Sequence, residues 1–288
     1  MQPQDTRRTM EELCVLHTTL EPELRDVYAE SRRDARFYAW LLQNAGIKVS
    51  GVYAVDDRLL VSASEVESAD GEVGPRGRLM GLAFAVTSWG IDDPRITCIV
   101  DADWDLIYGG PDYPDLLRTD GGSVEVYSFA PRPLQHFLDL VLSTDRDATQ
   151  LLTDMVPLLN DLYMVRGILH RFGPGVPVIE RFVACCTCCG SPWTVDVPDL
   201  LKRSLNAAAL ADRLPVMLEE FDKAGRALPV DRRLAVRGHD IAPILAKGLS
   251  LTNEWSKREV IEGSLRGCLQ FDDMEQTSLL TELRVRFT

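Results

Sequence analysis

The stretch CIVDADWDLIYGG, residues 98–110, carries three aspartates at alternate positions directly after a short apolar run. Ile and Val favour strands and Asp does not, so the sequence predicts a buried strand that ends near Asp101. Alternate residues of an extended chain point the same way, which brings the like charges of Asp101, Asp103 and Asp105 close together. A bound cation would offset that repulsion, and paired carboxylates suit Mg²⁺ or Mn²⁺. An acidic loop without a metal is the alternative.

A second carboxylate falls at an equivalent place earlier in the chain. Residues 25–31 predict a short strand that ends at Glu30, residues 32–46 a helix with one apolar face, and residues 48–55 another strand. In open sheets of parallel strands, ligands bind at the carboxyl ends of the strands. If the strands that end at Glu30 and Asp101 are neighbours, three carboxylates converge on one spot and form a metal site.

The first half of the chain alternates strand and helix patterns. The polar, Gly-rich tract 68–78 predicts a loop, residues 79–89 a buried helix, residues 123–129 a further strand or its end, and residues 132–142 a helix. This alternation predicts an α/β fold with a mostly parallel sheet and flanking helices.

After about residue 145 the pattern becomes helical. Apolar faces and Gly or Pro punctuation predict helices over 150–173, 200–225, 239–251 and 257–269. An irregular patch, 176–198, interrupts them. The expected organisation is an N-terminal segment over 1–21, an α/β domain over 22–145 and a mainly helical domain over 146–288.

Composition restricts the function classes. The chain has 288 residues, of which 45% are hydrophobic and 26% charged, as in soluble globular proteins. No apolar run approaches the roughly 20 residues that a membrane helix needs, and the polar N-terminus lacks the apolar core of a signal peptide, so we expect a cytoplasmic protein with no membrane partner. A net charge of −13 argues against a protein that coats nucleic acid unaided, but it does not exclude a nuclease.

The cysteines do not form a secreted disulfide framework. Four of the seven stand together in CCTCC, residues 185–189, which holds two overlapping C-x-x-C spacings. No second C-x-x-C and no H-x-x-x-H completes a zinc tetrahedron, so packed thiols are the favoured interpretation. The sequence also lacks G-x-x-x-x-G-K-[ST], the signature of a P-loop ATPase.

Three kinds of enzyme place D-x-D after a strand: haloacid-dehalogenase-type phosphatases, glycosyltransferases and TOPRIM nucleases. The first needs D-x-D near the first strand, whereas here a strand–helix–strand unit precedes it. The second needs a nucleotide-binding half upstream, for which the sequence gives no support. The order of elements therefore counts against the first two kinds.

Four motifs carry a resemblance to a known family. In chain order they are VYAESRRDARFY, CIVDADWD, LRTDGGSVEVYSFAPRPLQHFL and VRGHDIAPILAKGL. Together they resemble the TOPRIM-type domain called DUF4435, over most of residues 22–250. One departure is Ser31, because the family usually has Gly after its catalytic Glu, and Ser lacks the freedom to adopt positive φ.

The resemblance implies roles for particular residues. Glu30 would be the metal-linked general acid/base, Asp34 would hold Glu30 or a metal-bound water, and Glu30 with Asp101 and Asp103 would bind Mg²⁺ or Mn²⁺. Weaker candidates around this site are Asp105, Asp120 and Glu125. Candidates for contacts with substrate phosphates are Arg32, Arg33 and Arg36, for which a solvated helix face is the alternative.

The resemblance also implies a function. TOPRIM chemistry is metal-assisted phosphodiester transfer or hydrolysis, here on DNA or RNA. Proteins of this kind resemble effectors of bacterial phage defence of the PARIS-like, OLD type, in which a separate ABC- or OLD-type ATPase controls the nuclease. The resemblance also allows a homodimer as the active form. The competing interpretation is a non-catalytic TOPRIM-like interaction module in the same kind of complex, for which Ser31 is the main support.

Overall fold

The computed structural model of the chain describes residues 7–69, 72–90, 95–173 and 175–287. Contacts divide the chain into two compact units. The sheet unit consists of Met1–Asp101, Gly110–Asp120 and Met274–Thr288, and the helical unit of Ala102–Gly109 and Gly121–Asp273. The chain therefore passes from one unit to the other directly after Asp101.

The sheet unit is built on four parallel strands in the order β2-β1-β3-β4. Their bounds are β1 Asp26–Ala29, β2 Gly51–Ala54, β3 Ile96–Val100 and β4 Leu116–Arg118. Every residue of β1 and β3 is buried, as expected for the central strands of a parallel sheet covered on both faces. The α/β class with a parallel sheet and flanking helices is thus confirmed.

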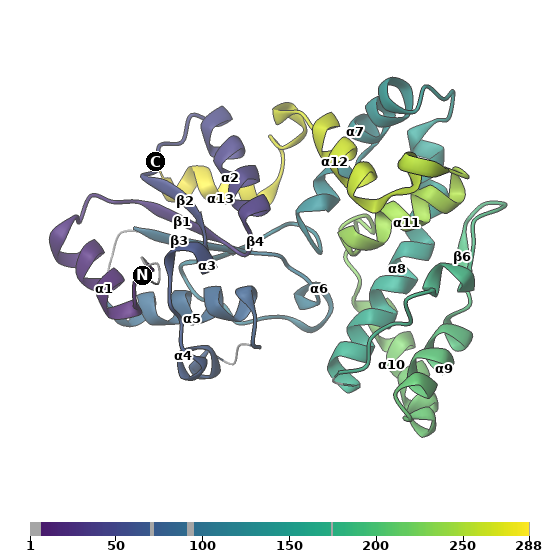
Figure 1. Ribbon diagram of the computed structural model, residues 1–288, viewed down its shortest axis with the longest axis horizontal. Helices are drawn as coiled ribbons and strands as arrows, with labels where there is room; N and C mark the ends of the chain where they lie inside the picture. The colour runs from purple at the N-terminus through teal and green to yellow at the C-terminus, as the bar shows by residue number, and fades with distance from the viewer. Residues whose placement is uncertain (1–6, 70–71, 91–94, 174, 288) are drawn as a thin grey trace, which may run out of the picture. The chain divides into compact units, whose positions relative to one another are not determined.

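Helices cover both faces of this sheet, with α2 and α13 on one side and α5 on the other (Figure 1). The helices of the sheet unit are α1 Met10–Val15, which continues as a π-helical turn over Leu16–Leu20, α2 Arg32–Asn44, α3 Val55–Arg58, α4 Ala63–Ser68, α5 Pro75–Ser88 and α13 Ser278–Phe287. Leu79, Leu82 and Ala83 of α5 pack on the side chains of Tyr28 and Cys98, which gives this face its apolar core.

The helical unit is organised around α8, Ala148–Phe172, which packs against its neighbours α7, α9, α10 and α11 (Figure 1). Its other regular elements are α6 Asp105–Tyr108, α7 Pro131–His136 with a π-helical turn over Phe137–Val141, β5 Cys186–Thr187, β6 Thr194–Val195, α9 Val197–Ala207, α10 Leu214–Ala227, α11 Gly238–Gly248 and α12 Arg258–Cys268. Short 3₁₀ turns cover Val124–Ser128, Phe182–Cys185, Ala211–Arg213, Asn253–Ser256 and Phe271–Asp273. Among all the described helices, none is both long and apolar enough to cross a bilayer.

The prediction of a strand over 123–129 is wrong. Val124–Ser128 forms a 3₁₀ turn that belongs to the helical unit. The hydroxyl of Ser123 accepts a hydrogen bond from the backbone N–H of Gly238, at 3.2 Å, and Glu125 pairs with Arg266 of α12. The alternation of Val124 and Val126 that suggests a strand reflects packing against helices, because tertiary contacts override local pattern.

Three other boundaries differ from expectation. The tract 68–78 is not all loop, because α5 begins at Pro75, a residue well suited to a first helical position. The region 200–225 is two helices, since Ala209 adopts φ +57° and breaks the helix before α10. The irregular patch 176–198 contains the antiparallel pair β5–β6.

The division into units also differs from the expected boundary at residue 145. The chain enters the helical unit at Ala102, returns to the sheet unit for Gly110–Asp120, and returns again for α13, which packs beside β4. Hydrophobic pattern along the sequence reports local structure and cannot show such returns. Residues 10–20 of the expected N-terminal segment form α1 and its π-helical extension, with Leu13 buried in the core of the sheet unit.

Candidate functional site

Glu30 and Asp101 meet at the carboxyl edge of the sheet. Strands β1 and β3 are parallel neighbours, with Ala29 opposite Ile99, so the residues that follow the two strands share one edge. The Glu30 Oε1 atom accepts a hydrogen bond of 2.9 Å from the backbone N–H of Asp101. Both residues are half-buried. This contact fixes one oxygen of the Glu30 carboxylate against the end of β3.

Arg76 contributes a cation to the same strand end. Its guanidinium, from the first turn of α5, donates a hydrogen bond to the backbone carbonyl of Asp101. A guanidinium here offsets part of the negative charge that Glu30 and Asp101 gather. The sequence analysis missed Arg76 because it lies in the tract expected to be a loop. The signal that could have found it is Pro75 followed by a run of helix formers.

Ser31 takes the place of the family's Gly without backbone strain. Its φ and ψ are −132° and 163°, an extended conformation that any residue adopts. The Ser31 hydroxyl caps α2 by accepting hydrogen bonds of 3.2 Å from the backbone N–H groups of Arg33 and Asp34. The loop after Glu30 therefore does not need glycine.

Asp34 takes part in the same cap. Its Oδ2 atom accepts a hydrogen bond of 2.6 Å from the Ser31 hydroxyl. The carboxylate also lies in the first turn of α2, where a negative charge is favourable toward the helix dipole. These contacts give Asp34 a structural task beside the catalytic one that the resemblance implies.

The three arginines of α2 are exposed, and one of them is paired with an acid. The Arg32 guanidinium makes a bidentate contact with Asp57 of α3, with N–O distances of 2.7 to 3.0 Å. The hydrogen bonds that Arg32 donates to Asp57 raise the pKa of Arg32 and lower the pKa of Asp57. Arg33 and Arg36 are exposed on the same helix. Arg32 is therefore already paired with an acid, which makes it the weaker of the phosphate-contact candidates on this helix when compared with Arg36.

Asp103 and Asp105 belong to the helical unit. Asp103 adopts φ +41°, its backbone N–H donates to the carbonyl of Gly122 at 3.2 Å, and its carbonyl accepts from the hydroxyl of Tyr163. Asp105 begins α6. Because Asp101 and Asp103 are two residues apart, chain geometry alone limits their Cα–Cα distance to about 7 Å.

Two weaker candidates have structural tasks. The Asp120 carboxylate accepts hydrogen bonds from the backbone N–H groups of Ser278, at 2.6 Å, and Leu279, at 3.3 Å, and so caps the N-terminus of α13. Glu125 forms an ion pair of 2.7 Å with Arg266, and both side chains are largely buried. Sequence spacing could not reveal these partners, which lie more than 140 residues away.

The donor set fits a hard cation with few protein ligands. Over the part of the chain that the structure describes, no group of three or more His, Cys, Asp or Glu side chains has the arrangement of a metal site. Mg²⁺, however, commonly takes one or two carboxylates and completes its octahedron with waters and substrate phosphates. Glu30 and Asp101 supply such a pair on the sheet unit.

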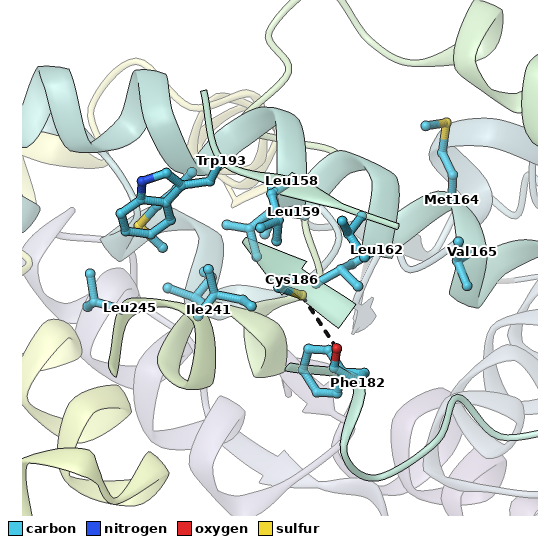
Figure 2. Close-up of a cluster of buried hydrophobic side chains, with 14 of the residues drawn as sticks. Leu158, Leu159, Leu162, Met164, Val165, Phe182, Cys186, Trp193, Ile241 and Leu245 are labelled. Carbon is cyan, nitrogen blue, oxygen red and sulfur yellow. Dashed lines mark hydrogen bonds between the residues drawn. The ribbon is translucent and has the colours of Figure 1, made fainter. Parts of the chain in front are cut away.

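The cysteine cluster is only partly packed, because Cys185 and Cys186 are buried, Cys188 is half-buried and Cys189 is exposed. Cys186 lies among apolar side chains of the helical unit that include Leu162, Trp193 and Ile241 (Figure 2). Its Sγ atom donates to the backbone carbonyl of Phe182 at 3.5 Å, and burial raises the pKa of the thiol to about 12. A thiol that stays protonated is a poor metal ligand and nucleophile.

Comparison with models of known protein families finds no match for this chain, and a search of curated proteins finds none either. The family resemblance therefore depends on the four sequence motifs, and the function is argued from the site.

Proposed function

We propose that the chain is a Mg²⁺- or Mn²⁺-dependent nuclease of the TOPRIM type, which hydrolyses phosphodiester bonds of DNA or RNA. The observation that carries the proposal is the hydrogen bond between Glu30 Oε1 and the backbone N–H of Asp101 at the carboxyl edge of a parallel sheet. The carboxylate of Glu30 thus contacts the backbone of an aspartate 71 residues further along the chain, at the edge where α/β sheets bind their ligands. A cation from Arg76 stands beside them.

The contacts of Glu30 suit a group that moves a proton. The hydrogen bond from Asp101 holds Oε1, so the orientation of the carboxylate is set before a substrate arrives. Glu30 then takes a proton from the attacking water as the water oxygen bonds to phosphorus, while the P–O bond to the leaving group breaks and the leaving oxygen receives a proton from solvent water. A divalent metal, when bound, would stabilise the charge on the phosphate. Asp101, and Asp103 two residues on, are the proposed ligands.

We propose further that a partner controls this activity. The net charge of −13 repels a polyanion, so the chain alone should meet nucleic acid slowly. The sequence has no P-loop signature, so a nucleotide switch would have to come from another chain. These features favour an effector of phage defence, cytoplasmic and held by an ABC- or OLD-type ATPase, with a homodimer as a candidate active form.

The second candidate function is a non-catalytic interaction module of the same complex. Its main support in the sequence is Ser31 in place of Gly. Because Ser31 is extended and caps α2, the substitution gives no reason to expect a distorted loop after Glu30. The nuclease is therefore the better-supported proposal.

Expression in bacteria with and without a candidate ATPase partner, under phage challenge, tests the two proposals. The wild type should be toxic or protective, and Glu30→Gln should be inert while still folded and still bound to the partner. Glu23→Gln is the matched control, because Glu23 is an exposed glutamate of the same unit. Protection by Glu30→Gln equal to that of the wild type would rule out catalysis and favour the interaction module.

A further inference from the structure

A cluster of charged side chains surrounds the start of α11 in the helical unit. The Arg166 guanidinium donates two hydrogen bonds, of 2.6 and 2.7 Å, to the Asp240 carboxylate, and both side chains are largely buried. The Glu262 Oε1 atom accepts a hydrogen bond of 2.6 Å from Arg258 Nε and lies 3.2 Å from His239 Nδ1. Each of these two carboxylates therefore already has a cationic partner.

Arg237 is the additional cation of this cluster. Within the described ranges, its side chain forms no ion pair and no hydrogen bond, although the residue is only partly exposed. Burial lowers the pKa of Arg237, and the neighbouring charge of Arg166 acts in the same direction. Arg166 holds Asp240 and Arg258 holds Glu262 through hydrogen bonds, whereas Arg237 feels the charges of Asp240 and Asp103 without a hydrogen bond to either.

The backbone places Arg237 next to the segment that carries Asp103. Gly122 accepts the N–H of Asp103 at 3.2 Å and donates its own N–H to the carbonyl of Leu234 at 2.9 Å. A Cβ at Gly122 would lie 2.5 Å from the carbonyl oxygen of Val236, so only glycine allows this approach. On the other side of Arg237, the N–H of Gly238 donates to the hydroxyl of Ser123.

One short loop, residues 122–123, therefore forms hydrogen bonds with Asp103, Leu234 and Gly238 and lies against the backbone of Val236. The charge of Asp103 acts on Arg237 across this gap and favours its protonated form. The helical unit consequently holds the carboxylate of Asp103 and a guanidinium that makes no hydrogen bond on the two sides of this packed loop.

We propose that Arg237 binds a non-bridging oxygen of a nucleic-acid phosphate beside Asp103. This inference rests on the proposed nuclease function and adds a substrate-binding residue to it. A guanidinium fits a phosphate through two parallel hydrogen bonds, and a phosphate would supply the anionic partner that Arg237 lacks. Asp103 and Arg237, both on the helical unit, would then lie beside the same phosphate.

Binding measured without cleavage tests this role. In a Glu30→Gln background, the affinity for short fluorescein-labelled DNA and RNA strands is followed by anisotropy in Ca²⁺ at several salt concentrations. Arg237→Gln should weaken binding about tenfold and lower the slope of log K against log salt by about one. The affinity of Arg237→Lys should fall between those of the parent and Arg237→Gln. Arg232→Gln, an exposed arginine of the same loop, is the matched control and should bind like its parent.

The strand types separate the substrates. A loss confined to RNA, or to DNA, identifies the nucleic acid whose phosphate Arg237 contacts. Equal binding by Arg237→Gln and its parent, or no measurable binding of either strand by the parent, would overturn the proposal. Because the Arg237 side chain makes no bond, Arg237→Gln should keep the thermal midpoint of its parent, so misfolding would be evident.

Cleavage assays distinguish this proposal from the nuclease proposal. With Glu30 intact and the partner present, Arg237→Gln should raise KM more than it lowers kcat. If the wild type cleaves and Arg237→Gln cleaves with unchanged KM, the inference fails and the nuclease stands. If the wild type binds without cleaving and Arg237→Gln weakens that binding, the nuclease fails and the phosphate contact stands.

Discussion

Replacement of Asp120 separates a structural role from a metal-binding one. The Asp120 carboxylate accepts the backbone N–H groups of Ser278 and Leu279 at 2.6 and 3.3 Å, so Asp120→Ala leaves two donors at the start of α13 without their partner. Loss of such a cap costs about 1 to 2 kcal/mol. For a unit of this size that is about 4 to 8 °C in thermal midpoint. Asparagine has one acceptor oxygen where Asp120 uses both Oδ1 and Oδ2, so Asp120→Asn should keep one of the two hydrogen bonds and lose less stability than Asp120→Ala.

Calorimetry or thermal melts followed by circular dichroism measure the thermal midpoints of both variants, and titration with Mn²⁺ measures their metal affinity. The helix-cap account expects normal Mn²⁺ affinity in both variants, because neither removes Glu30 or Asp101. Asp112→Ala, an exposed aspartate of the same unit, controls for loss of charge. The reasoning is refuted if Asp120→Asn melts like the wild type but loses Mn²⁺, since Asp120 would then be a ligand.

Three further predictions follow from individual contacts. Ser31→Gly should cost only a few tenths of a kcal/mol in unfolding free energy and keep activity, whereas Ser31→Ala should cost about 1 kcal/mol, because the hydroxyl caps α2 and the backbone is extended. Chemical denaturation measures both variants, and a large loss of stability for Ser31→Gly would contradict this prediction. Burial alone would raise the pKa of Glu262, but hydrogen bonds from His239 and Arg258 lower it to about 2 from its usual 4.5. The stability from this group is therefore present above pH 4.5 and lost as the pH falls toward 2, and Glu262→Gln should flatten that part of a stability–pH curve. Iodoacetamide should label exposed Cys189 before Cys186, whose burial raises its thiol pKa to about 12; mass spectrometry at short times shows the order, and equal labelling would contradict it.

The sequence alone predicted the parts of the fold that depend on local pattern. The strands before Glu30 and Asp101 have a clear β pattern bounded by turn residues, and helix α2 has a clear apolar face. The sequence could not show that the strands ending at Glu30 and Asp101 are neighbours, and the structure places β1 directly beside β3.

The remaining parts depend on contacts distant in sequence. Arg76 reaches Asp101 because α5 starts earlier than the Gly-rich composition suggested. Asp120 and Glu125 gained partners from α13 and α12, which no spacing near either residue could indicate. Arg237 can be recognised as a candidate only after Arg166 and Arg258 are known to bind Asp240 and Glu262, because the sequence alone does not distinguish it from other arginines.

Mn²⁺ binding followed by electron paramagnetic resonance tests the central claim most directly, namely that Glu30 and Asp101 form a divalent-metal centre. Free Mn²⁺ is titrated with the wild type, Glu30→Gln, Asp101→Asn and the control Glu23→Gln. Since the metal would take one or two carboxylates, loss of either should weaken binding by about tenfold or more, while the control binds like the wild type. Equal Mn²⁺ affinity in all four proteins would place the metal elsewhere and contradict the account.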